Sequence, residues 1–428
     1  MMKNISKFIF ILSIICTSCS GIQPITVKNG TFYKGSKPYH FIGTNYWYGP
    51  LIAAKEIGDR PRLIKELDLM KEQGIDNLRI LVGAEGGNED FQVKPALQYE
   101  QGKYNEQLLD GLDFLLSEMS KRNMYAVLYL NNNWIWSGGM STYLQWNGYG
   151  TVPNPFLKDY TWPEYFEYTQ QFHSCEPCQI AFEKHIRFIL NRTNTYTGKK
   201  YTDDNSIMSW QVANEPRIFT EQDREPFKKF LDRTVSLLRA IDPNTLISTG
   251  AEGKASYLDD IDTYQRLHSN PDIDYLTAHM WPKNWGWYNA DDEERTLQES
   301  IQKAAIYTDE HIAVARRLNK PLVVSEFGFP REKESLSPTA SVKNRNAFYE
   351  ALFKKLVQSK KDKNPFMGIN FWGFAGFAKT DSITGKWQEG ADFSADPPQE
   401  PQGLNSVFAI DYSTLSLVKN YNALFKKD

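Results

Sequence analysis

The sequence predicts a (β/α)8 barrel, the TIM-barrel class of α/β fold, formed by one domain with long loops after its strands. Eight apolar segments of strand length alternate with amphipathic segments of helical period, and this alternation favours a parallel sheet. A chain of 428 residues is within the range of a single barrel. A doubly wound open sheet is the main alternative, but no Gly-rich phosphate-binding loop follows the first expected strand. Residues 20–428 are therefore expected to form a single barrel domain.

The expected elements follow in regular order. A hairpin comes first, because Asn29-Gly30 favours the left-handed backbone of a tight turn. The eight expected strands are 40–45, 77–82, 125–130, 207–213, 245–250, 275–279, 322–326 and 368–372. The expected helices include 60–73, 108–122, 179–191, 225–241, 297–318 and 342–358. The connection 131–179 is long and rich in tryptophan and amides, which predicts substrate contacts, whereas 388–402 is expected to be a surface loop.

The composition excludes several classes of protein. Hydrophobic residues make up 41% of the chain, which is enough for a large core and argues against disorder. The net charge of −3 argues against a nucleic-acid partner, which requires a concentrated basic surface. No motif for a metal, nucleotide or organic cofactor is present, so we expect none of these groups, and we expect a monomer. Core packing accounts for many of the 11 tryptophans, but tryptophan beside polar residues also suits stacking on the apolar faces of sugar rings.

The amino-terminal segment is not expected to belong to the barrel. Lys3 and Lys7 border an apolar stretch at 8–16, and small residues surround Cys19, which indicates a secretory signal too short for a permanent anchor. Its end, Cys-Thr-Ser-Cys-Ser, resembles a bacterial lipoprotein signal with Cys19 as the acylated residue; Cys16 fits less well because bulky Ile15 precedes it. Residues 1–19 are thus expected to direct export and lipid anchoring in the cell envelope, on either face of the outer membrane. A cleaved signal with a stray cysteine is the alternative.

The remaining cysteines form a Cys-x-x-Cys motif. Cys175 and Cys178 lie at the start of an expected helix, where the helix dipole favours a thiolate, so a redox dithiol is one interpretation. Together with His173 they could also supply half of a zinc site. No second cysteine pair remains after residue 19, and an exported chain favours oxidised thiols. We therefore expect a local structural disulfide.

Two of the apolar segments end abruptly in a carboxylate. Glu215 follows the segment 207–213, and Glu326 ends the segment 322–326. Because the carboxyl ends of parallel barrel strands meet at one mouth, the two glutamates are expected to face each other across a cleft. Glycoside hydrolysis uses such a pair, with one protonated carboxyl and one ionised carboxylate. The alternative is a pair of ion-pair partners at the rim of the barrel.

These features resemble glycoside hydrolase family 5 of clan A, and within it the β-mannanases, over nearly the whole mature chain. Several motifs of the family occur here in the family's order, and together they are more specific than the Asn-Glu-Pro motif alone. The resemblance rests on Phe41-Ile42-Gly43-Thr44-Asn45-Tyr46, Leu78-Arg79, Asn132-Asn133-Trp134, Asn214-Glu215-Pro216-Arg217, His279, Glu326-Phe327-Gly328 and Phe371-Trp372.

The resemblance implies roles for the charged and polar residues. Glu215 matches the general acid/base, which must hold its proton near neutral pH, and Glu326 matches the nucleophile, which must stay ionised. Arg79 matches the charge beside the nucleophile, and Asn214 the asparagine that binds the sugar 2-hydroxyl. His279 is expected to orient the acid/base or to contact substrate, with a hydrogen-bonded barrel histidine as the alternative.

The remaining expected contacts are aromatic or cationic. Trp372 matches the platform under the sugar before the cleaved bond, although a lone tryptophan is more often part of a core. Trp281 stands where the family commonly has tyrosine, and its indole can only donate. Arg217 resembles the arginine on the leaving-group side, with an ordinary surface arginine as the alternative. Trp134 is expected to contact substrate from the long loop.

The implied function is that of a retaining endo-β-1,4-mannanase that cleaves mannan, glucomannan or galactomannan by double displacement. Three alternatives stay open. An exo-acting mannobiohydrolase or β-mannosidase would use the same chemistry in a different cleft, and a β-1,4-glucanase would share the catalytic frame. A surface glycan-binding lipoprotein without activity would not need both Glu215 and Glu326.

Overall fold

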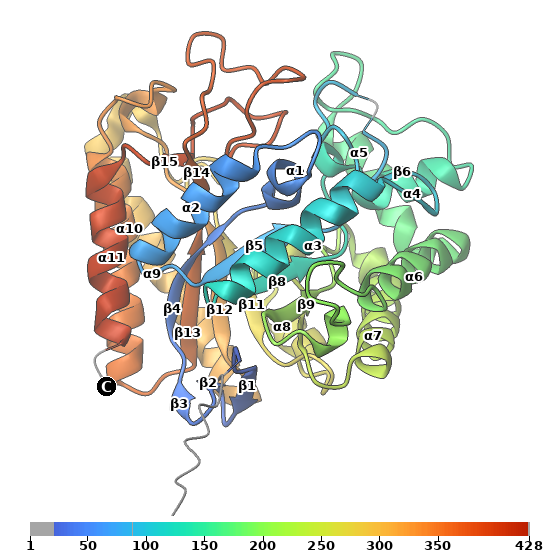
Figure 1. The fold of residues 1–428 in the computed structure, drawn as a ribbon, viewed down its shortest axis with the longest axis horizontal. Helices are drawn as coiled ribbons and strands as arrows, with labels where there is room; N and C mark the ends of the chain where they lie inside the picture. Colours follow the sequence, from blue (N-terminus) through green and yellow to red (C-terminus); the bar gives the residue numbers. More distant parts are fainter. Residues whose placement is uncertain (1–20, 88, 427–428) are drawn as a thin grey trace, which may run out of the picture.

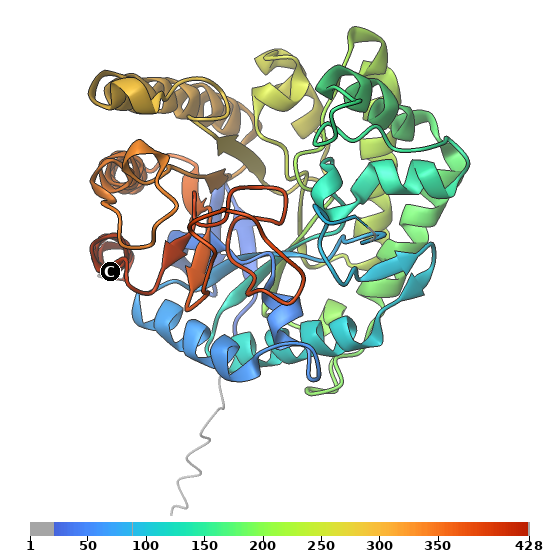
Figure 2. The same ribbon diagram turned by 90° about the horizontal axis from the view of Figure 1, so that it is seen from above.

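Eight parallel strands form a barrel at the centre of the molecule (Figures 1 and 2). The computed structural model describes residues 21–87 and 89–426. Neighbouring strands follow chain order around the barrel, and between β10 and β11 backbone hydrogen bonds from Asp274 to Ile247 (2.8 Å) and from His279 to Glu252 (2.9 Å) close the circle. The barrel strands are β4 (Phe41–Asn45), β5 (Asn77–Leu81), β8 (Tyr125–Tyr129), β9 (Ile207–Gln211), β10 (Leu246–Ser248), β11 (Leu276–Met280), β12 (Leu322–Phe327) and β13 (Phe366–Phe371). The predicted barrel and its eight strands are confirmed.

Helices surround the barrel, as Figure 2 shows from above. Each arises from an apolar stripe at helical spacing; in α3, for example, Leu108, Leu112 and Leu116 are buried, and Asn105 caps the first turn through the Gln107 backbone N–H (3.0 Å). The outer helices are α2 (Arg60–Glu72), α3 (Glu106–Lys121), α6 (Glu176–Leu190), α7 (Arg224–Ile241), α8 (Ile261–His268), α9 (Glu293–Leu318), α10 (Lys343–Lys361) and α11 (Tyr412–Phe425). Helices α8 and α11 were not among the expected segments.

A small antiparallel sheet covers the amino end of the barrel (Figure 1). It consists of β1 (Ile25–Lys28), β2 (Thr31–Lys34) and β3 (Lys37–Pro38), and the predicted turn at Asn29-Gly30 has positive φ at both residues. Phe32 packs edge-on against Tyr275 at the start of β11, with ring centroids 5.3 Å apart. This packing covers the amino end of the barrel, and the large cavity lies at the opposite, carboxyl end.

Long connections build up that carboxyl end. Residues 131–175 are more regular than the expected loop, because they contain α4 (Gly139–Trp146) and α5 (Trp162–Thr169). The segment between β14 (Phe374–Gly376) and β15 (Val407–Phe408) folds around buried Asp396, which accepts hydrogen bonds from the backbone of Gly403 (2.9 Å) and Asn405 (2.9 Å). The short elements α1 (Gly49–Ala53), β6 (Gln98–Glu100) and β7 (Lys103–Tyr104) complete the structure.

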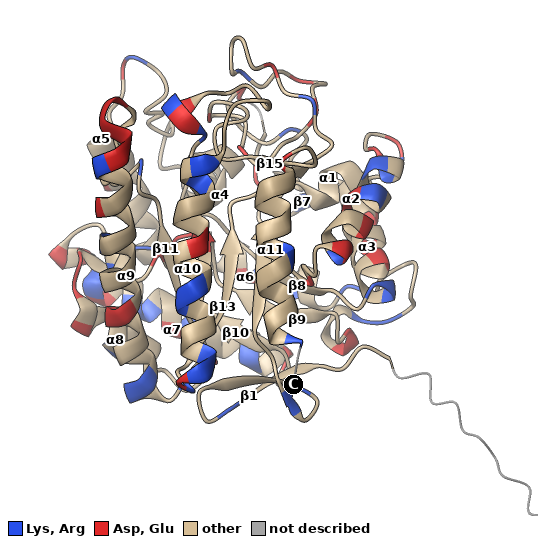
Figure 3. Cartoon of the chain, turned by 90° about the vertical axis from the view of Figure 1, so that its left-hand side faces the viewer, with Lys and Arg blue, Asp and Glu red and all other residues tan. Residues whose placement is uncertain are grey.

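The outer surface carries charges of both signs. Figure 3 shows basic and acidic side chains interspersed along α9 and α10, whereas α11 is almost uncharged. A surface of this kind does not attract a polyanion. None of the helices within 21–87 and 89–426 is long and apolar enough to cross a membrane. The predicted signal 1–19, with Cys16 and Cys19, lies outside the described residues.

The predicted disulfide joins Cys175 and Cys178. Both cysteines are buried, and Cys175 occupies the N-cap of α6, where its sulfur accepts the Cys178 backbone N–H at 3.2 Å. The bridge therefore fixes the junction between the 131–175 connection and α6. Neither cysteine lines the large cavity at the carboxyl end of the barrel.

We expect the Cys175→Ser/Cys178→Ser double variant to lose stability and to keep its activity. Without the bridge the unfolded chain has more conformational freedom, which lowers the free energy of unfolding. We expect a decrease of roughly 1–3 kcal/mol, because the closed loop is short. Urea denaturation and kcat, measured on the same preparation, check this. A large fall in kcat at unchanged Tm would instead give the cysteines a direct role in chemistry.

Buried histidines predict a loss of stability in mild acid. Burial lowers the pKa of His311 to about 4. Its neutral ring donates from Nδ1 to the Tyr307 carbonyl (2.7 Å) and accepts the Lys254 backbone N–H at Nε2 (2.9 Å). Between the unfolded pKa near 6.5 and the folded pKa, only the unfolded chain takes up the proton, so the stabilisation is complete above about pH 6.5 and decreases toward pH 4.

The His311→Gln variant should therefore show a flatter pH dependence than the wild type. Between pH 7 and pH 4.5 we expect the free energy of unfolding of the wild type to fall by roughly 1–3 kcal/mol more than that of the variant. Urea titrations at a series of pH values measure the difference. Parallel curves for the two proteins would contradict the assignment.

Candidate active site

The carboxyl end of the barrel opens into a cleft with a cavity of about 740 Å³. Both strand-end glutamates line it, together with eight aromatic side chains. The aromatic residues are Trp134, Trp136, Phe156, Trp162, Phe166, Trp281, Trp285 and Trp372, of which Trp285 lies at the edge and also borders a neighbouring cavity. A concave, aromatic site with few polar groups is typical of small-molecule and sugar binding.

Glu215 extends from the end of β9 into this cleft. Its backbone is left-handed (φ 50°), an uncommon conformation for a residue with a side chain, and it is held by a hydrogen bond from its N–H to the Gly250 carbonyl (3.0 Å). His279 Nδ1 lies 2.6 Å from one Glu215 oxygen, and the Trp134 indole N–H donates to the other. Both oxygens of Glu215 are thus positioned by neighbours from other strands.

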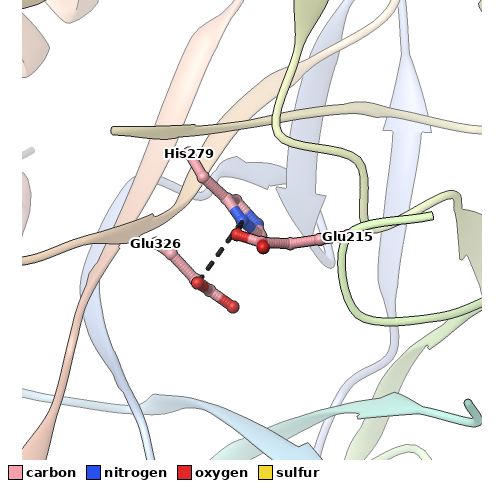
Figure 4. A group of neighbouring side chains, drawn as sticks. All are labelled: Glu215, His279 and Glu326. Carbon is pink, nitrogen blue, oxygen red and sulfur yellow. Dashed lines mark hydrogen bonds and ion pairs between the residues drawn. The ribbon is translucent and has the colours of Figure 1, made fainter. Parts of the chain in front are cut away.

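Glu326 projects from β12 on the opposite side of His279. The Arg79 guanidinium donates to one of its oxygens, and His279 Nδ1 lies 3.4 Å from the other. Trp281 acts as a hydrogen-bond donor that lowers the pKa of Glu326, so the indole occupies the position expected for a family tyrosine. Glu215, His279 and Glu326 point toward one another in Figure 4, and one oxygen of each glutamate and one nitrogen of the histidine lie within 4.8 Å of one another.

The two glutamates titrate as a coupled pair with one high and one low pKa. Burial raises the pKa of both. At Glu215 the hydrogen bonds from His279 and Trp134 outweigh burial and bring the pKa to about 2, whereas at Glu326 burial and the charge of Glu215 outweigh Arg79 and keep the pKa well above its usual value. Two buried carboxyl groups this close together do not both ionise readily, so the pair holds one proton, for which Glu215 and Glu326 compete.

His279 can pair with Glu215 in either protonation state. Burial lowers its pKa to about 4, so the ring is neutral, and its Nε2 lies 2.9 Å from the Ser325 hydroxyl. In one tautomer Nδ1–H donates to an ionised Glu215; in the other, Nε2–H donates to Ser325 and Nδ1 accepts from a protonated Glu215. The heavy atoms therefore fit both an ionised and a protonated Glu215.

Arg79 is the centre of a buried polar network. It donates to Gln211 (2.7 Å), Asn45 (3.1 Å) and Asn214 (2.8 Å) besides Glu326. Asn214 in turn donates to Asn132 (3.1 Å). These contacts fix the guanidinium in one orientation and direct its charge at Glu326, as the sequence analysis expected.

The predicted aromatic and cationic residues divide between the two sides of the pair. Trp281 and Trp372 contact each other on the Glu326 side, with ring centroids 5.7 Å apart. On the Glu215 side, the Arg217 guanidinium lies over the Trp134 ring at 4.8 Å and forms an ion pair with Glu252. The structure therefore brings all nine predicted site residues, Arg79, Trp134, Asn214, Glu215, Arg217, His279, Trp281, Glu326 and Trp372, to one end of the barrel.

Sequence reasoning missed some residues of the cleft. Glu252 follows the apolar segment 245–250 and had the same strand-end signal as the two catalytic candidates. Trp136 lies two residues after Trp134 and also lines the cleft. The segment 388–402, expected as a surface loop, instead brings Gln399 and Glu400 into the cleft, where burial and the charges of neighbouring carboxyls raise the pKa of Glu400 to about 8.

The glutamates and His279 are close enough to hold a metal ion. However, Glu326 already accepts a hydrogen bond from Arg79, and the positive guanidinium opposes a cation at that oxygen. The residues of this site are thus arranged for proton transfer and for contact with a neutral ligand.

A parallel barrel with two glutamates at strand ends, one beside an arginine and one beside a histidine, defines the class of barrel glycoside hydrolases. The family comparison agrees. The chain belongs to glycoside hydrolase family 5, because the β-mannosidase-like model of that family matches residues 22–428.

The chain is also similar to solved structures and to curated proteins. The crystal structure of a glycoside hydrolase family 5 mannosidase from Rhizomucor miehei is 32% identical, with a TM-score of 0.87, over 95% of this chain and 98% of that chain. A mutant of that mannosidase was crystallised in complex with mannosyl-fructose. Mannan endo-1,4-β-mannosidase 7 of Arabidopsis thaliana is 25% identical over 395 residues, which cover 87% of this chain and 84% of that protein.

Proposed function

We propose that the protein hydrolyses β-mannosidic bonds by double displacement, with retention of configuration. The approach of the two carboxyl groups to within 4.8 Å supports this, because retaining enzymes place them about 5–5.5 Å apart and inverting enzymes about 6.5–9.5 Å apart. In the first step a Glu326 oxygen bonds to the anomeric carbon, the bond to the leaving oxygen breaks, and Glu215 gives its proton to that oxygen. In the second step Glu215 takes a proton from water, and the water oxygen displaces Glu326.

The catalytic state has its proton on Glu215. Sugar binding removes water from around the pair, which strengthens the attraction between Arg79 and an ionised Glu326. The leaving oxygen at the same time offers an acceptor for a protonated Glu215. Both effects favour the His279 tautomer that accepts from Glu215, so in the complex the proton of the pair lies on Glu215.

The proposed substrate is a β-1,4-linked mannan, glucomannan or galactomannan cleaved within the chain. Several curated relatives, all 25–27% identical, bear the name mannan endo-1,4-β-mannosidase. Chromatography of early products from linear mannan tests this proposal. A spread of short oligosaccharides is expected, and a β-glucan control should stay intact; release of a single small product would contradict internal cleavage.

Chain-end cleavage is a second candidate. The relative of known structure with 32% identity is called a mannosidase. In addition, Pro397, Gln399 and Glu400 border the cleft from the segment after β14, and a loop that closes one end of a groove favours chain ends. Mannooligosaccharides capped at the non-reducing end separate the two candidates, because only internal cleavage tolerates the cap.

We also propose that the protein is exported and anchored by lipid at Cys19. The basic start, the apolar segment 8–16 and Ser18 before Cys19 support this. Mass spectrometry of the native protein tests it through the mass of the amino-terminal peptide. An unmodified terminus beyond residue 19 would exclude the anchor, and a Cys19→Ala variant should leave the membrane fraction.

A further inference from the structure

The amino end of the barrel differs in charge from its sides. In Figure 3 basic segments are visible at the lower ends of α9 and α10 and beside β1. Lysines of this end come from the small antiparallel sheet and from the carboxyl-terminal ends of α2, α10 and α11 with the residues directly after them. We call eight of them the basic face: Lys28, Lys34, Lys37, Lys71, Lys360, Lys361, Lys363 and Lys426.

Interactions within the fold place several of these lysines together. Lys34 and Lys37 are opposite each other where β2 pairs with β3, so their side chains leave the sheet on the same side. Asp76, before β5, lies among three members of the basic face. Burial raises its pKa, whereas the charges of Lys34, Lys426 and Lys71 lower it. One carboxyl thus faces three ammonium groups, which leaves an excess of positive charge.

The end of α10 adds to the same area. Burial and the charge of Lys360 lower the pKa of His40 to about 4. The His40 ring stacks on Phe425, the residue directly before Lys426, with ring centroids 5.8 Å apart. The ends of α10 and α11 therefore meet beside β4. The exposed members of the basic face are Lys28, Lys37, Lys71, Lys361, Lys363 and Lys426.

Only part of this charge has a structural reason. A cation at the carboxyl end of a helix is stabilised by the helix dipole, and this accounts for the lysines in the last turns of α2 and α10. The three lysines of the small sheet have no such reason, because a sheet has little net dipole. They add positive charge to an end of the molecule that already carries it. This arrangement is repulsive within the fold and favours an anionic partner.

The start of the described chain indicates which partner this is. Ile22 is buried in the core at the amino end, and the Gln23 carbonyl accepts a hydrogen bond from the Tyr125 hydroxyl at 2.8 Å. The Lys34 ammonium lies over the same Tyr125 ring, 4.8 Å from its centroid. Cys19 precedes Ile22 by three residues, which span at most about 11 Å. A lipid on Cys19 would therefore hold the basic face against the surface of the bilayer.

We propose that the basic face binds the phosphate groups of anionic lipids in the membrane that holds the Cys19 lipid. The inference rests on the lipid anchor proposed above and is independent of the proposed hydrolysis. Lysine suits this role, because its ammonium binds phosphate as a point charge without a fixed geometry. The lipid and the basic face act as two membrane signals side by side. The barrel then stands with its amino end on the membrane, and the cleft at its carboxyl end opens away from the membrane.

The first test measures binding to lipid vesicles without the anchor. It uses residues 20–428, because the core of the described barrel begins at Ile22. We expect binding to vesicles of phosphatidylglycerol but not of phosphatidylcholine, and we expect it to weaken as salt screens the charges. The Lys28→Gln/Lys37→Gln/Lys361→Gln variant should bind about 100-fold more weakly, since each lysine near an anionic surface strengthens binding about fivefold.

A matched control has the same net charge. The Lys158→Gln/Lys343→Gln/Lys386→Gln variant loses three exposed lysines that follow the carboxyl ends of barrel strands, far along the chain from the basic face. This control should bind phosphatidylglycerol vesicles as the wild type does. Equal losses in the two triple variants would show that only net charge matters and would overturn the inference, as would equal binding to phosphatidylcholine.

The second test determines the orientation of the lipidated protein on vesicles that contain phosphatidylglycerol. An environment-sensitive dye is attached to Ser36→Cys, in the turn of the small sheet, or to Gln388→Cys, between β14 and β15; both positions are exposed. Membrane binding should shift the emission of the first dye only. Equal shifts, or a shift of the second dye alone, would contradict the orientation. A Cys19 without lipid would instead overturn the anchor, and the vesicle assay would still decide whether the basic face binds anionic lipid.

Discussion

Glu326→Gln is expected to abolish turnover on every substrate, with kcat reduced by at least about 10⁴-fold. The amide cannot form the glycosyl-enzyme bond, so neither a good leaving group nor added azide can restore activity. The amide oxygen can still accept from Arg79, and the remaining cleft is unchanged, so binding of mannooligosaccharides should stay measurable by calorimetry. The variant should also melt at a lower temperature, because the buried Arg79 charge loses its counter-ion.

A matched control is available in the same chain. Glu389 is exposed in the segment after β14, and Glu389→Gln makes the same chemical change away from the cleft. This control should keep wild-type kcat and stability. Residual activity of Glu326→Gln above one part in a hundred, with the control normal, would show that another group is the nucleophile.

Strand positions could be predicted because a parallel strand buried on both faces leaves a continuous apolar segment. Glu215 and Glu326 were found by the same signal, since each interrupts such a segment at its carboxyl end. Arg79 likewise interrupts an apolar segment, although it lies within β5. A charge inside a buried strand requires a buried partner, here Glu326. The positions of charged residues at or within apolar, parallel strands were thus enough to predict the centre of the site.

The outer parts of the cleft could not be predicted in this way. The segment that carries Glu400 has no periodic pattern; its path depends on Asp396, whose carboxylate binds backbone N–H groups of Gly403 and Asn405. Without a periodic pattern of apolar residues, the sequence of a loop does not allow its position on the barrel to be predicted. The hydrogen bonds that govern the protonation of the two carboxyl groups were also beyond sequence reasoning, because only the folded barrel brings their partners together.

The same hydrogen bonds connect the recognised motifs physically. Asn132, Asn214 and Arg79 come from three different strand ends and form one chain of contacts that ends at Glu326. His279 joins Glu215 to Ser325, the residue directly before Glu326. The motifs of the sequence are therefore parts of one network that sets the distance and the protonation of the two carboxyl groups.

Glu215→Ala should affect substrates in proportion to how much their leaving group needs a proton. On mannan, where an alkoxide would have to leave, we expect kcat/KM to fall roughly 10²–10⁴-fold. On 2,4-dinitrophenyl β-mannoside the first step needs no acid, so the glycosyl-enzyme should form quickly and then accumulate, because no base activates water. A burst of dinitrophenol followed by slow turnover is the expected time course.

Azide then distinguishes the two stereochemical mechanisms. It is a strong nucleophile that needs no general base, so it should speed the slow phase of Glu215→Ala on the dinitrophenyl substrate while leaving the wild type unaffected. Because the glycosyl-enzyme on Glu326 has inverted configuration, attack by azide inverts it again and gives β-mannosyl azide. NMR of the product determines its anomeric configuration. An α-azide would mean direct displacement at the substrate, which is incompatible with Glu326 as a nucleophile 4.8 Å or less from Glu215 and with retention in this barrel.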